Sequence, residues 1–389
     1  MPLRFLTAGE SHGPGLTAIL EGMPAGLTLN EEIIDRQLAR RQKGYGSGPR
    51  MKLEQDRAQI VSGVMEGKTT GAPLAFFIPN QDHARWKGKS IDSFTVPRPG
   101  HADLTGVIKY GFNDLRPALE RASARETTAR VAVGAVCLHY LNQFGIFIGG
   151  YVTSLGEISA SLHNIPIEQR AALAEESDVR CPDLIAAEAM RQRIFSIMQA
   201  RDTLGGVIEI AAWGLPVGLG SYVQADRRLD SRLGGALLSV QSVKGVEIGP
   251  AFENTLLPGS QVHDAIRLNG GDLVRPTNRA GGLEGGVTNG QPLILRAALK
   301  PIATTLVEQQ SVDLATGQET ATRYERSDFC HVPRAVPILE AVVALVLADA
   351  LIEKTGGDSL DEQLLRYAQF RKARLDDILL DPGGHTFWT

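Results

Sequence analysis

Cysteine is scarce in this sequence. The 389 residues include three cysteines, Cys137, Cys181 and Cys330, which lie far apart along the chain. An odd number of cysteines at wide spacing predicts neither a disulfide framework nor a zinc site of the CxxC type. Cys330 and His331 are adjacent, but the sequence offers no further ligands at a useful spacing, so we expect no metal site.

A large charge of one sign and a long uninterrupted apolar run are also missing. The net charge is −4 and the isoelectric point is near 6.1, which argues against a general nucleic-acid-binding protein. The N-terminal stretch MPLRFLTAGESHG lacks the apolar segment of a signal peptide, and later apolar runs are interrupted too early to span a bilayer. We therefore expect a cytoplasmic globular enzyme with no membrane or nucleic-acid partner.

No linker rich in Ser, Gly or Pro divides the chain, so we expect a single domain over residues 1–389. The segments GKTTGAPL (67–74) and GVTNGQPL (286–293) share Gly, Thr, Gly, Pro and Leu at matching positions. Each leads into a strand-like stretch, and a long apolar helix follows in each half. Internal duplication and coincident turn chemistry both explain such a match.

Two apolar segments predict buried helices. Ser123 and Glu126 form an S-x-x-E capping box before a helix that is apolar nearly all round, and residues 337–352 form a second apolar segment. A similar box at Thr28 and Glu31 predicts a helix that ends at Gly44. Two buried helices flanked by glycine-rich strand pairs indicate helices that lie between sheets, so we expect an α+β fold. The lack of GxGxxG and P-loop motifs at suitable positions is consistent with this arrangement.

Arginine gathers at the expected ends of these helices. Arg40 and Arg41 lie in the last helical turn before Gly44, where cations suit the helix dipole, but the glycine-rich loop with Arg50 favours an anion site. Arg121 and Arg125 flank the start of the first buried helix, where free N–H groups attract anions.

The segment QPLILRAALKP (291–301) adds further positive charge. It alternates apolar residues with a face that carries Arg296 and Lys300, and that face is a candidate lining for a basic cavity. Arg326 and Asp328 precede the second buried helix, where a surface salt bridge is the alternative to a functional role.

His12 in GESHGPG and His101 in RPGHAD lie in loops between glycine and rigid neighbours. Such positions hold a side chain in place without packing it into a core. Together with the arginines, these residues indicate a cavity for a multiply anionic ligand in which protons are transferred near neutral pH.

Eight segments then match one known family, in its order, between about residues 4 and 350. They are AGESHG, RRQKGYG, RPGHADLTGVIKYGF, ERASARETTARVAVGA, SVKGVEIG, NRAGG, GGVTNGQP and RAVPILEAV. The chain resembles the chorismate synthase family. This resemblance implies a β-α-β sandwich with internal pseudo-two-fold symmetry, assembled as a homotetramer.

The resemblance also implies an activity. Such an enzyme is a lyase that eliminates phosphate from 5-enolpyruvylshikimate-3-phosphate by an anti-1,4-elimination and produces chorismate, in the shikimate pathway of aromatic amino acid biosynthesis. It requires reduced FMN without net redox change. Some members reduce the flavin with NADPH themselves, but no segment of this chain resembles an added reductase domain, so we expect a monofunctional enzyme supplied by a separate flavin reductase.

Residue roles follow from the resemblance position by position. It implies that His101 protonates reduced flavin near N1, that His12 protonates the departing phosphate and that Asp328 assists deprotonation at flavin N5. The implied substrate-binding residues are Ser11, Arg41, Arg50, Arg98, Ser123, Arg125 and Arg326. The implied FMN-binding residues are Arg121, Ala122, Ser123, Gln241, Ser242, Gly285, Lys300, Pro301, Ile302, Ala303, Thr304 and Arg326.

One position departs from the family pattern. The family commonly reads G-Y-G-R-G-x-R where this chain has GYGSGPR, so Ser47 replaces an arginine, and Lys43 is the expected compensating cation. Two other functions fit a basic cavity. A phosphatase or kinase of a sugar acid is disfavoured by the missing P-loop and metal cluster, and an anionic-polymer-binding module by the net charge.

Overall fold

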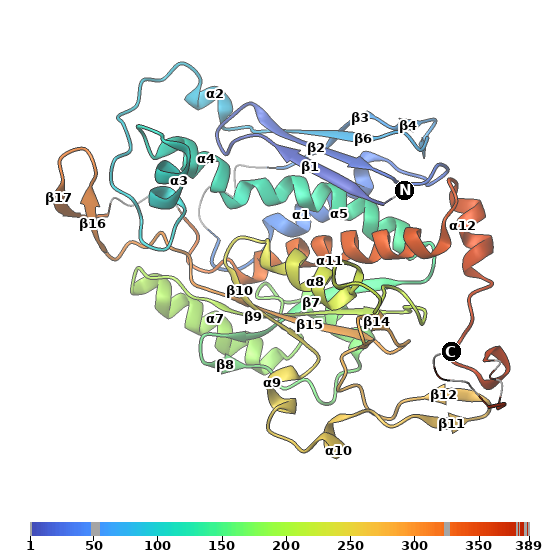
Figure 1. Cartoon of the computed structure of the whole chain (residues 1–389). Helices are drawn as coiled ribbons and strands as arrows, with labels where there is room; N and C mark the ends of the chain where they lie inside the picture. Colours follow the sequence, from blue (N-terminus) through green and yellow to red (C-terminus); the bar gives the residue numbers. More distant parts are fainter. Residues whose placement is uncertain are drawn as a thin grey trace.

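The computed structural model describes residues 2–47, 55–322, 327–378, 380, 382–384 and 387. Helices and strands occupy separate layers: two antiparallel sheets lie on either side of the helices α1 (Glu31–Gln42), α5 (Thr127–Asn142) and α11 (Val332–Thr355), as Figure 1 shows. This arrangement confirms the α+β class.

The first sheet has four strands in the order β1-β2-β6-β3. The strands are β1 (Arg4–Ala8), β2 (Gly15–Glu21), β6 (Leu74–Pro79) and β3 (Gln59–Ser62). Buried and less buried side chains alternate along β6, with Leu74, Phe76 and Ile78 fully buried. Period-two burial is typical of a sheet with one face on the core, and here that face packs against α5.

The second sheet has five strands in the order β10-β15-β9-β7-β8. These are β10 (Val243–Ile248), β15 (Leu293–Leu299), β9 (Gly206–Trp213), β7 (Phe147–Leu155) and β8 (Ile158–Ser159). The alternation predicted for residues 293–299 is confirmed. Arg296 is paired with two carboxylates, since its Nε donates to Glu209 at 2.7 Å and its Nη1 lies 3.6 Å from Glu247, and its place in the lining of a basic cavity stays a prediction.

The two buried helices α5 and α11 cross at the centre of the molecule. A Cβ atom added at Gly134 of α5 would lie 2.3 Å from the Cβ of Ala341 on α11, so glycine permits the close approach. Among the described residues, α11 alone is long and apolar enough to cross a membrane, contrary to our expectation that every apolar run is too short. Most of α11 is buried in the protein, as in the core helix of a globular domain.

The two repeated segments form the same local structure. A short hairpin, β4 (Val64–Met65) with β5 (Lys68–Thr69), precedes β6, and the hairpin of β13 (Leu283–Glu284) with β14 (Val287–Thr288) precedes β15. The order β1-β2-β6-β3 also has the same chain sequence as β7-β9-β15-β10, with α1 following β2 and α8 (Leu229–Leu238) following β9. These observations favour duplication over coincident turns.

Three predicted helix boundaries differ from the structure. The cap of α1 is Asn30, whose side chain accepts a hydrogen bond from Ile33 N at 3.2 Å, whereas Thr28 lies outside the helix. Before α5, the short 3₁₀ helix η2 (Ala124–Glu126) intervenes, so Ser123 caps η2 and the Glu126 carboxylate bonds other partners. The second apolar helix extends to 332–355, since Pro333 is tolerated in a first helical turn.

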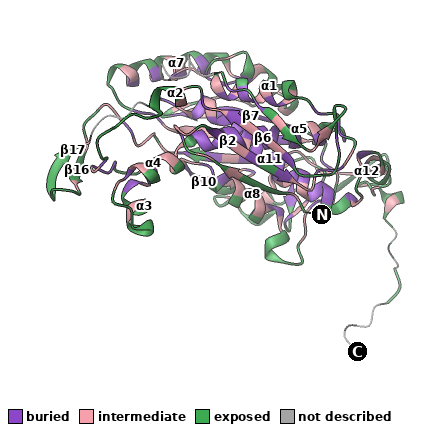
Figure 2. Cartoon of the chain, turned by 90° about the horizontal axis from the view of Figure 1, so that it is seen from above, coloured by how far each residue is buried: buried purple, intermediate pink, exposed green. Residues whose placement is uncertain are grey.

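The remaining elements surround these layers. They are α2 (His83–Trp86), α3 (Asp103–Tyr110), α4 (Arg116–Ala122), α6 (Ile167–Glu175), α7 (Leu184–Gln199), η3 (Ala225–Arg227), α9 (Ala251–Asn254), α10 (Gly259–Val262), β11 (Arg267–Asn269), β12 (Asp272–Val274), β16 (Gln310–Asp313), β17 (Gln318–Ala321), α12 (Leu360–Tyr367) and η4 (Leu375–Asp377). Figure 2 shows buried residues concentrated around β2, β6, α5 and α11, with α3 and the β16–β17 hairpin projecting at the exposed periphery.

Candidate active site

His12 lies in the loop between β1 and β2, where it is held against α4. Its Nδ1 is 2.7 Å from Glu120 Oε1, and its backbone N–H donates to Glu120 Oε2 at 2.8 Å. The ring also contacts Trp86, with centroids 4.7 Å apart. Burial acts to raise the pKa of Glu120, but the hydrogen bonds and charge of His12 lower it below its ordinary value, so the carboxylate stays ionised.

The same loop brings two predicted hydroxyl groups together. Ser123 Oγ donates to Ser11 Oγ at 3.3 Å, and the Ser11 backbone N–H donates to the Glu120 carbonyl at 3.2 Å. Ser123 directly follows Ala122, the last residue of α4. The end of α4 therefore places His12, Ser11 and Ser123 next to one another.

His101 belongs to a second cluster, centred on the fully buried Asp103. His101 Nδ1 is 2.6 Å from Asp103 Oδ1, and Arg98 donates from Nε and Nη2 to the two carboxylate oxygens at 2.8 and 2.9 Å. Burial acts to raise the pKa of Asp103, but Arg98 and His101 hold it well below its ordinary range. Arg98 was predicted to bind substrate; in this structure it forms a bidentate pair with Asp103.

The predicted flavin-binding segment 300–304 supports this second cluster. Thr304 Oγ1 accepts a hydrogen bond from Arg98 Nη1 at 3.1 Å, and Lys300 Nζ donates to the Gly100 carbonyl at 2.5 Å. The Ile302 carbonyl accepts from Thr203 Oγ1 at 2.8 Å. The segment, which also contains Pro301 and Ala303, thereby joins the loop that carries His101 to the second sheet.

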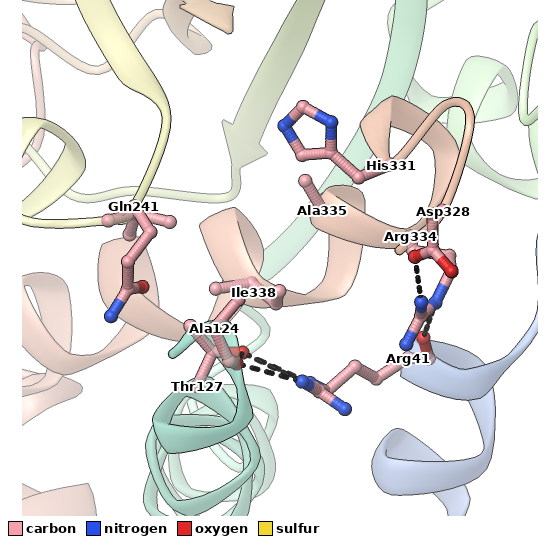
Figure 3. A pocket seen from close by; sticks show the side chains of 10 residues that line it. Arg41, Ala124, Thr127, Gln241, Asp328, His331, Arg334, Ala335 and Ile338 are labelled. Atoms are coloured by element: carbon pink, nitrogen blue, oxygen red, sulfur yellow. Dashed lines mark hydrogen bonds and ion pairs between the residues drawn. The ribbon is translucent and has the colours of Figure 1, made fainter. Parts of the chain in front are cut away.

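Asp328 lines a small cavity of about 70 Å³ at the start of α11 (Figure 3). Its carboxylate forms an ion pair with Arg334, and Arg334 Nε donates to the Arg41 carbonyl at 3.3 Å. The Arg41 side chain donates to Thr127 Oγ1 at 3.1 Å and to the Ala124 carbonyl at 3.0 Å. Arg41 and Asp328 therefore line one cavity between α1, α5 and α11.

Arg125 is buried in a polar cluster beside that cavity. Its Nη1 donates to both oxygens of Asp56, at 2.7 and 2.8 Å, and its Nε donates to Asn80 at 2.9 Å. Asp56 also lies 3.8 Å from Arg41 Nη1. The arginines predicted to line a basic cavity are thus paired with buried carboxylates, which fix the guanidinium groups in place.

A larger cavity, of about 400 Å³, opens on the other side of Gln241. It is lined by Phe5, Leu6, Thr7, Arg121, Glu126, Arg130 and Gln241. Arg121 donates to the Thr7 carbonyl at 3.1 Å, and Glu126 accepts from Thr7 Oγ1 at 2.6 Å and from Arg130 at 2.9 Å. Gln241 lines both cavities, and its Oε1 is buried without a hydrogen-bond partner among the described residues.

Some predicted residues lie outside the described part of the chain, and others lie away from the two cavities. Arg50 and Arg326 lie outside the described residues. Gly285 lies in the turn of the β13–β14 hairpin with φ of 61°, and it does not line either described cavity. Ser47 donates its hydroxyl to the Gly44 carbonyl and Lys43 is exposed, so compensation by Lys43 stays a prediction.

Sequence reasoning missed the partners of the predicted residues. Glu120 and Asp103 orient the two histidines, Arg334 pairs with Asp328, and His331 lines the smaller cavity. Asp103 was visible in the quoted RPGHAD motif, two residues after His101. Glu120 carried no comparable signal, because it is distant from His12 in sequence. Among the described residues, no group of three or more His, Cys, Asp or Glu side chains is placed to hold a metal ion.

Hydrogen bonds connect the residues around His12, the cluster around His101 and the cavity that Asp328 lines. The Ala124 carbonyl next to Ser123 accepts from Arg41, Ser242 contacts His331 at 2.6 Å, and the Ser242 carbonyl accepts from Lys300 N at 3.0 Å. The site therefore combines two histidines, each fixed by a carboxylate, with arginines and hydroxyl groups. This combination is suited to binding an anion and transferring protons to or from it.

Comparison with known proteins gives a consistent result. The sequence model of the family described as Chorismate synthase matches residues 3–352. The chain is 50% identical over 389 residues to the chorismate synthase of Chlorobaculum tepidum, covering 95% of this chain and 98% of the relative. It is 54% identical over 370 residues to that of Syntrophotalea carbinolica, covering 92% of this chain and 95% of the relative.

A solved structure agrees over nearly the whole length. The structure titled "Crystal Structure of Chorismate Synthase" superposes with a TM-score of 0.78 at 44% sequence identity, and the alignment covers 95% of this chain and 97% of the other. The sequence and structure comparisons thus identify the same family. This chain belongs to the chorismate synthase family, whose members are carbon–oxygen lyases.

Proposed function

We propose that this enzyme eliminates phosphate from 5-enolpyruvylshikimate-3-phosphate by an anti-1,4-elimination that requires reduced FMN without net redox change. In this reaction one C–O bond and one C–H bond of the substrate break, and chorismate, phosphate and a proton are formed. The observation that carries the proposal is the pairing of His12 with Glu120 and of His101 with Asp103, next to arginines and serines. It supplies proton-transferring groups at an anion-binding site.

The substrate carries two carboxylates and a phosphate, which matches the arginine content of the site. We assign substrate binding to Ser11, Arg41, Arg98, Ser123 and Arg125, and to Arg50 and Arg326 outside the described residues. Since Asp56 and Asp103 already balance several guanidinium charges, the arginines are pre-oriented and need little rearrangement when the substrate arrives.

Each histidine has a separate proposed role. His12 donates a proton to the departing phosphate, with Glu120 keeping the ring oriented. His101 holds a proton near flavin N1, with Asp103 in the orienting position. Asp328, paired with Arg334, assists proton removal near flavin N5.

The described residues fit a bound flavin. The buried Oε1 of Gln241 lacks a hydrogen-bond partner in the described part of the chain and lies beside a cavity of about 400 Å³, a volume in the range of small-molecule sites. Arg121, Ala122, Ser123, Ser242, Gly285 and the segment 300–304 would hold FMN together with Gln241. When bound, reduced flavin supplies electron density to the substrate as phosphate leaves and recovers it afterwards.

The wider setting is also proposed. We propose a homotetramer in the cytoplasm that receives reduced FMN from a separate flavin reductase. The matching strand orders of the two sheets support a pseudo-two-fold relation between the halves of a single domain over residues 1–389.

An anaerobic assay tests the reaction. Purified enzyme, 5-enolpyruvylshikimate-3-phosphate and FMN are mixed with or without dithionite, and chorismate and phosphate are both measured. We expect equal amounts of the two products, and only with reduced flavin. Turnover without flavin contradicts the proposal, and phosphate release without chorismate indicates a phosphatase instead.

A further inference from the structure

His331 occupies an unfavourable position for an imidazole. It precedes α11 and lines the smaller cavity, and among the described residues its buried Nδ1 has no hydrogen-bond partner. Burial lowers the pKa of His331 to about 4, so the ring is neutral at pH 7. An apolar side chain of similar size would avoid the cost of burying this nitrogen.

The other ring nitrogen has one short contact. Nε2 of His331 lies 2.6 Å from Ser242 Oγ, a distance typical of a strong hydrogen bond. The ring therefore bridges the start of α11 to the segment that enters β10. Neither the motifs nor the resemblance had assigned a role to His331.

Ser242 has an unusual backbone conformation. Its φ is 73°, in the left-handed region that residues other than glycine rarely adopt. The Ser242 carbonyl accepts a hydrogen bond from Lys300 N at 3.0 Å, and Lys300 Nζ donates to the Gly100 carbonyl at 2.5 Å. The conformation of Ser242 thus sets the position of Gln241 on one side and of the Lys300 segment on the other.

We infer that His331 is a positioning residue for the proposed flavin site: its hydrogen bond to Ser242 Oγ holds Ser242 in the left-handed conformation and so aligns Gln241 and Lys300. This inference rests on the proposed function for the identity of the ligand. The positions of Gln241 and Lys300 are already set in the protein without ligand.

Three variants separate this role from simple packing. His331→Leu keeps most of the side-chain volume and removes the hydrogen bond, whereas His331→Gln keeps a polar group at similar reach. Ser242→Gly replaces the strained residue by one that adopts a positive φ without strain. His163→Leu, at an exposed histidine in the loop before α6, serves as the matched control.

The first readout is hydrogen exchange of the Lys300 amide in protein without flavin. Loss of the hydrogen bond between His331 and Ser242 is expected to speed this exchange about three- to ten-fold in His331→Leu. FMN binding, followed by flavin fluorescence, is expected to weaken by the same factor. His331→Gln restores both values to within about two-fold, and the melting temperature of His331→Leu does not fall.

A double variant tests the mechanism. In a Ser242→Gly background, His331→Leu is expected to cause no further change in FMN affinity, because the strained conformation no longer needs support. Unchanged Lys300 exchange and FMN affinity in His331→Leu overturn the inference, as does a fully additive double variant. A wild-type protein that binds no FMN refutes the proposed function instead, and Lys300 exchange still decides the role of His331.

Discussion

An imidazole in a loop rotates freely unless a neighbour fixes it. His12 and His101 are each held by one buried or partly buried carboxylate, Glu120 and Asp103, through Nδ1. A carboxylate on one ring nitrogen sets the orientation of the ring and stabilises the protonated form while a proton is in transit. Two copies of this arrangement suit a reaction that moves protons at two places.

Replacing either histidine removes one of these groups. We expect His12→Ala and His101→Ala each to lower kcat by roughly 10- to 1000-fold, the usual scale for losing an acid–base group. Circular dichroism and melting temperature should stay near wild type, since both side chains are partly exposed. Near-normal turnover in both variants with normal FMN affinity would show that neither histidine is catalytic.

Asp103 acts through its neighbours. Asp103→Asn leaves the shape of the side chain but removes the charge that fixes Arg98 and His101, so we expect a kcat loss of about ten-fold or more. The same substitution in a His101→Ala background should cost much less of kcat, because the imidazole that Asp103 orients is gone. If the kcat losses of the two single variants multiply in the double variant, Asp103 does not act through His101.

At the level of elements, the contact between α5 and α11 leaves no room for a larger side chain. Gly134 faces Ala341 so closely that an added Cβ would lie within 2.6 Å of both its Cβ and Cα. Interiors are packed at crystal-like density, so this crossing cannot adjust without moving a helix. Both helices lead to the site, α5 through Thr127 and α11 through Arg334.

Gly134→Ala is therefore expected to destabilise the protein by about 1–3 kcal/mol, the typical cost of overpacking, despite the better helix propensity of alanine. Chemical denaturation measures the difference. Gly235→Ala in α8 is the control, because an added Cβ there meets no atom within 4 Å. It should be neutral or stabilising, and equal effects of the two substitutions would contradict the packing argument.

Periodic patterns predicted elements well and their ends poorly. The alternation along β15 and the apolar character of α5 and α11 were visible in the sequence, because burial of one face or of a whole helix dictates residue type. The cap of α1 is Asn30 and not Thr28, because several polar residues near a helix start compete for the same N–H groups. Ion-pair partners such as Glu120 and Asp56 depend on tertiary contacts, which no local pattern encodes.

For the whole molecule, acid should reduce stability in two stages. Burial acts to raise the pKa of four carboxyl groups, but their polar partners lower it more; they are Asp103, Glu120, Glu126 and Glu175. The stability that these carboxylates contribute to the folded state is therefore present above about pH 4 and is lost as the pH falls through their folded-state pKa values. His331 stays neutral when folded down to about pH 4, whereas an unfolded chain takes up the proton near pH 6.5.

We therefore expect the melting temperature to fall gradually from about pH 6.5 to pH 4 and more steeply below. His331→Leu should lack the gradual stage and keep the steep one. Differential scanning calorimetry across this range checks both, and a stability that rises on acidification would have the wrong sign.

The proposed need for a separate flavin reductase concerns the whole molecule. In the described residues, the elements outside the two sheets and their helices are short or peripheral. In that part of the chain, they do not form an additional domain of sheet and helices that could bind NADPH. We expect no sustained aerobic turnover of pure protein with NADPH and FMN, and full turnover after adding a flavin reductase. Sustained activity without the reductase would show that the chain reduces flavin itself.

The burial of α11 also has a consequence for synthesis. The first sheet, α1 and α5 leave the ribosome long before α11, yet α11 covers the inner faces of α5, β7 and β9. Until residue 355 is made, α5 and the inner face of the second sheet lack their shared partner. We therefore expect the nascent chain to stay partly folded until this long apolar helix is made, and to expose apolar surface that chaperones can bind in the meantime.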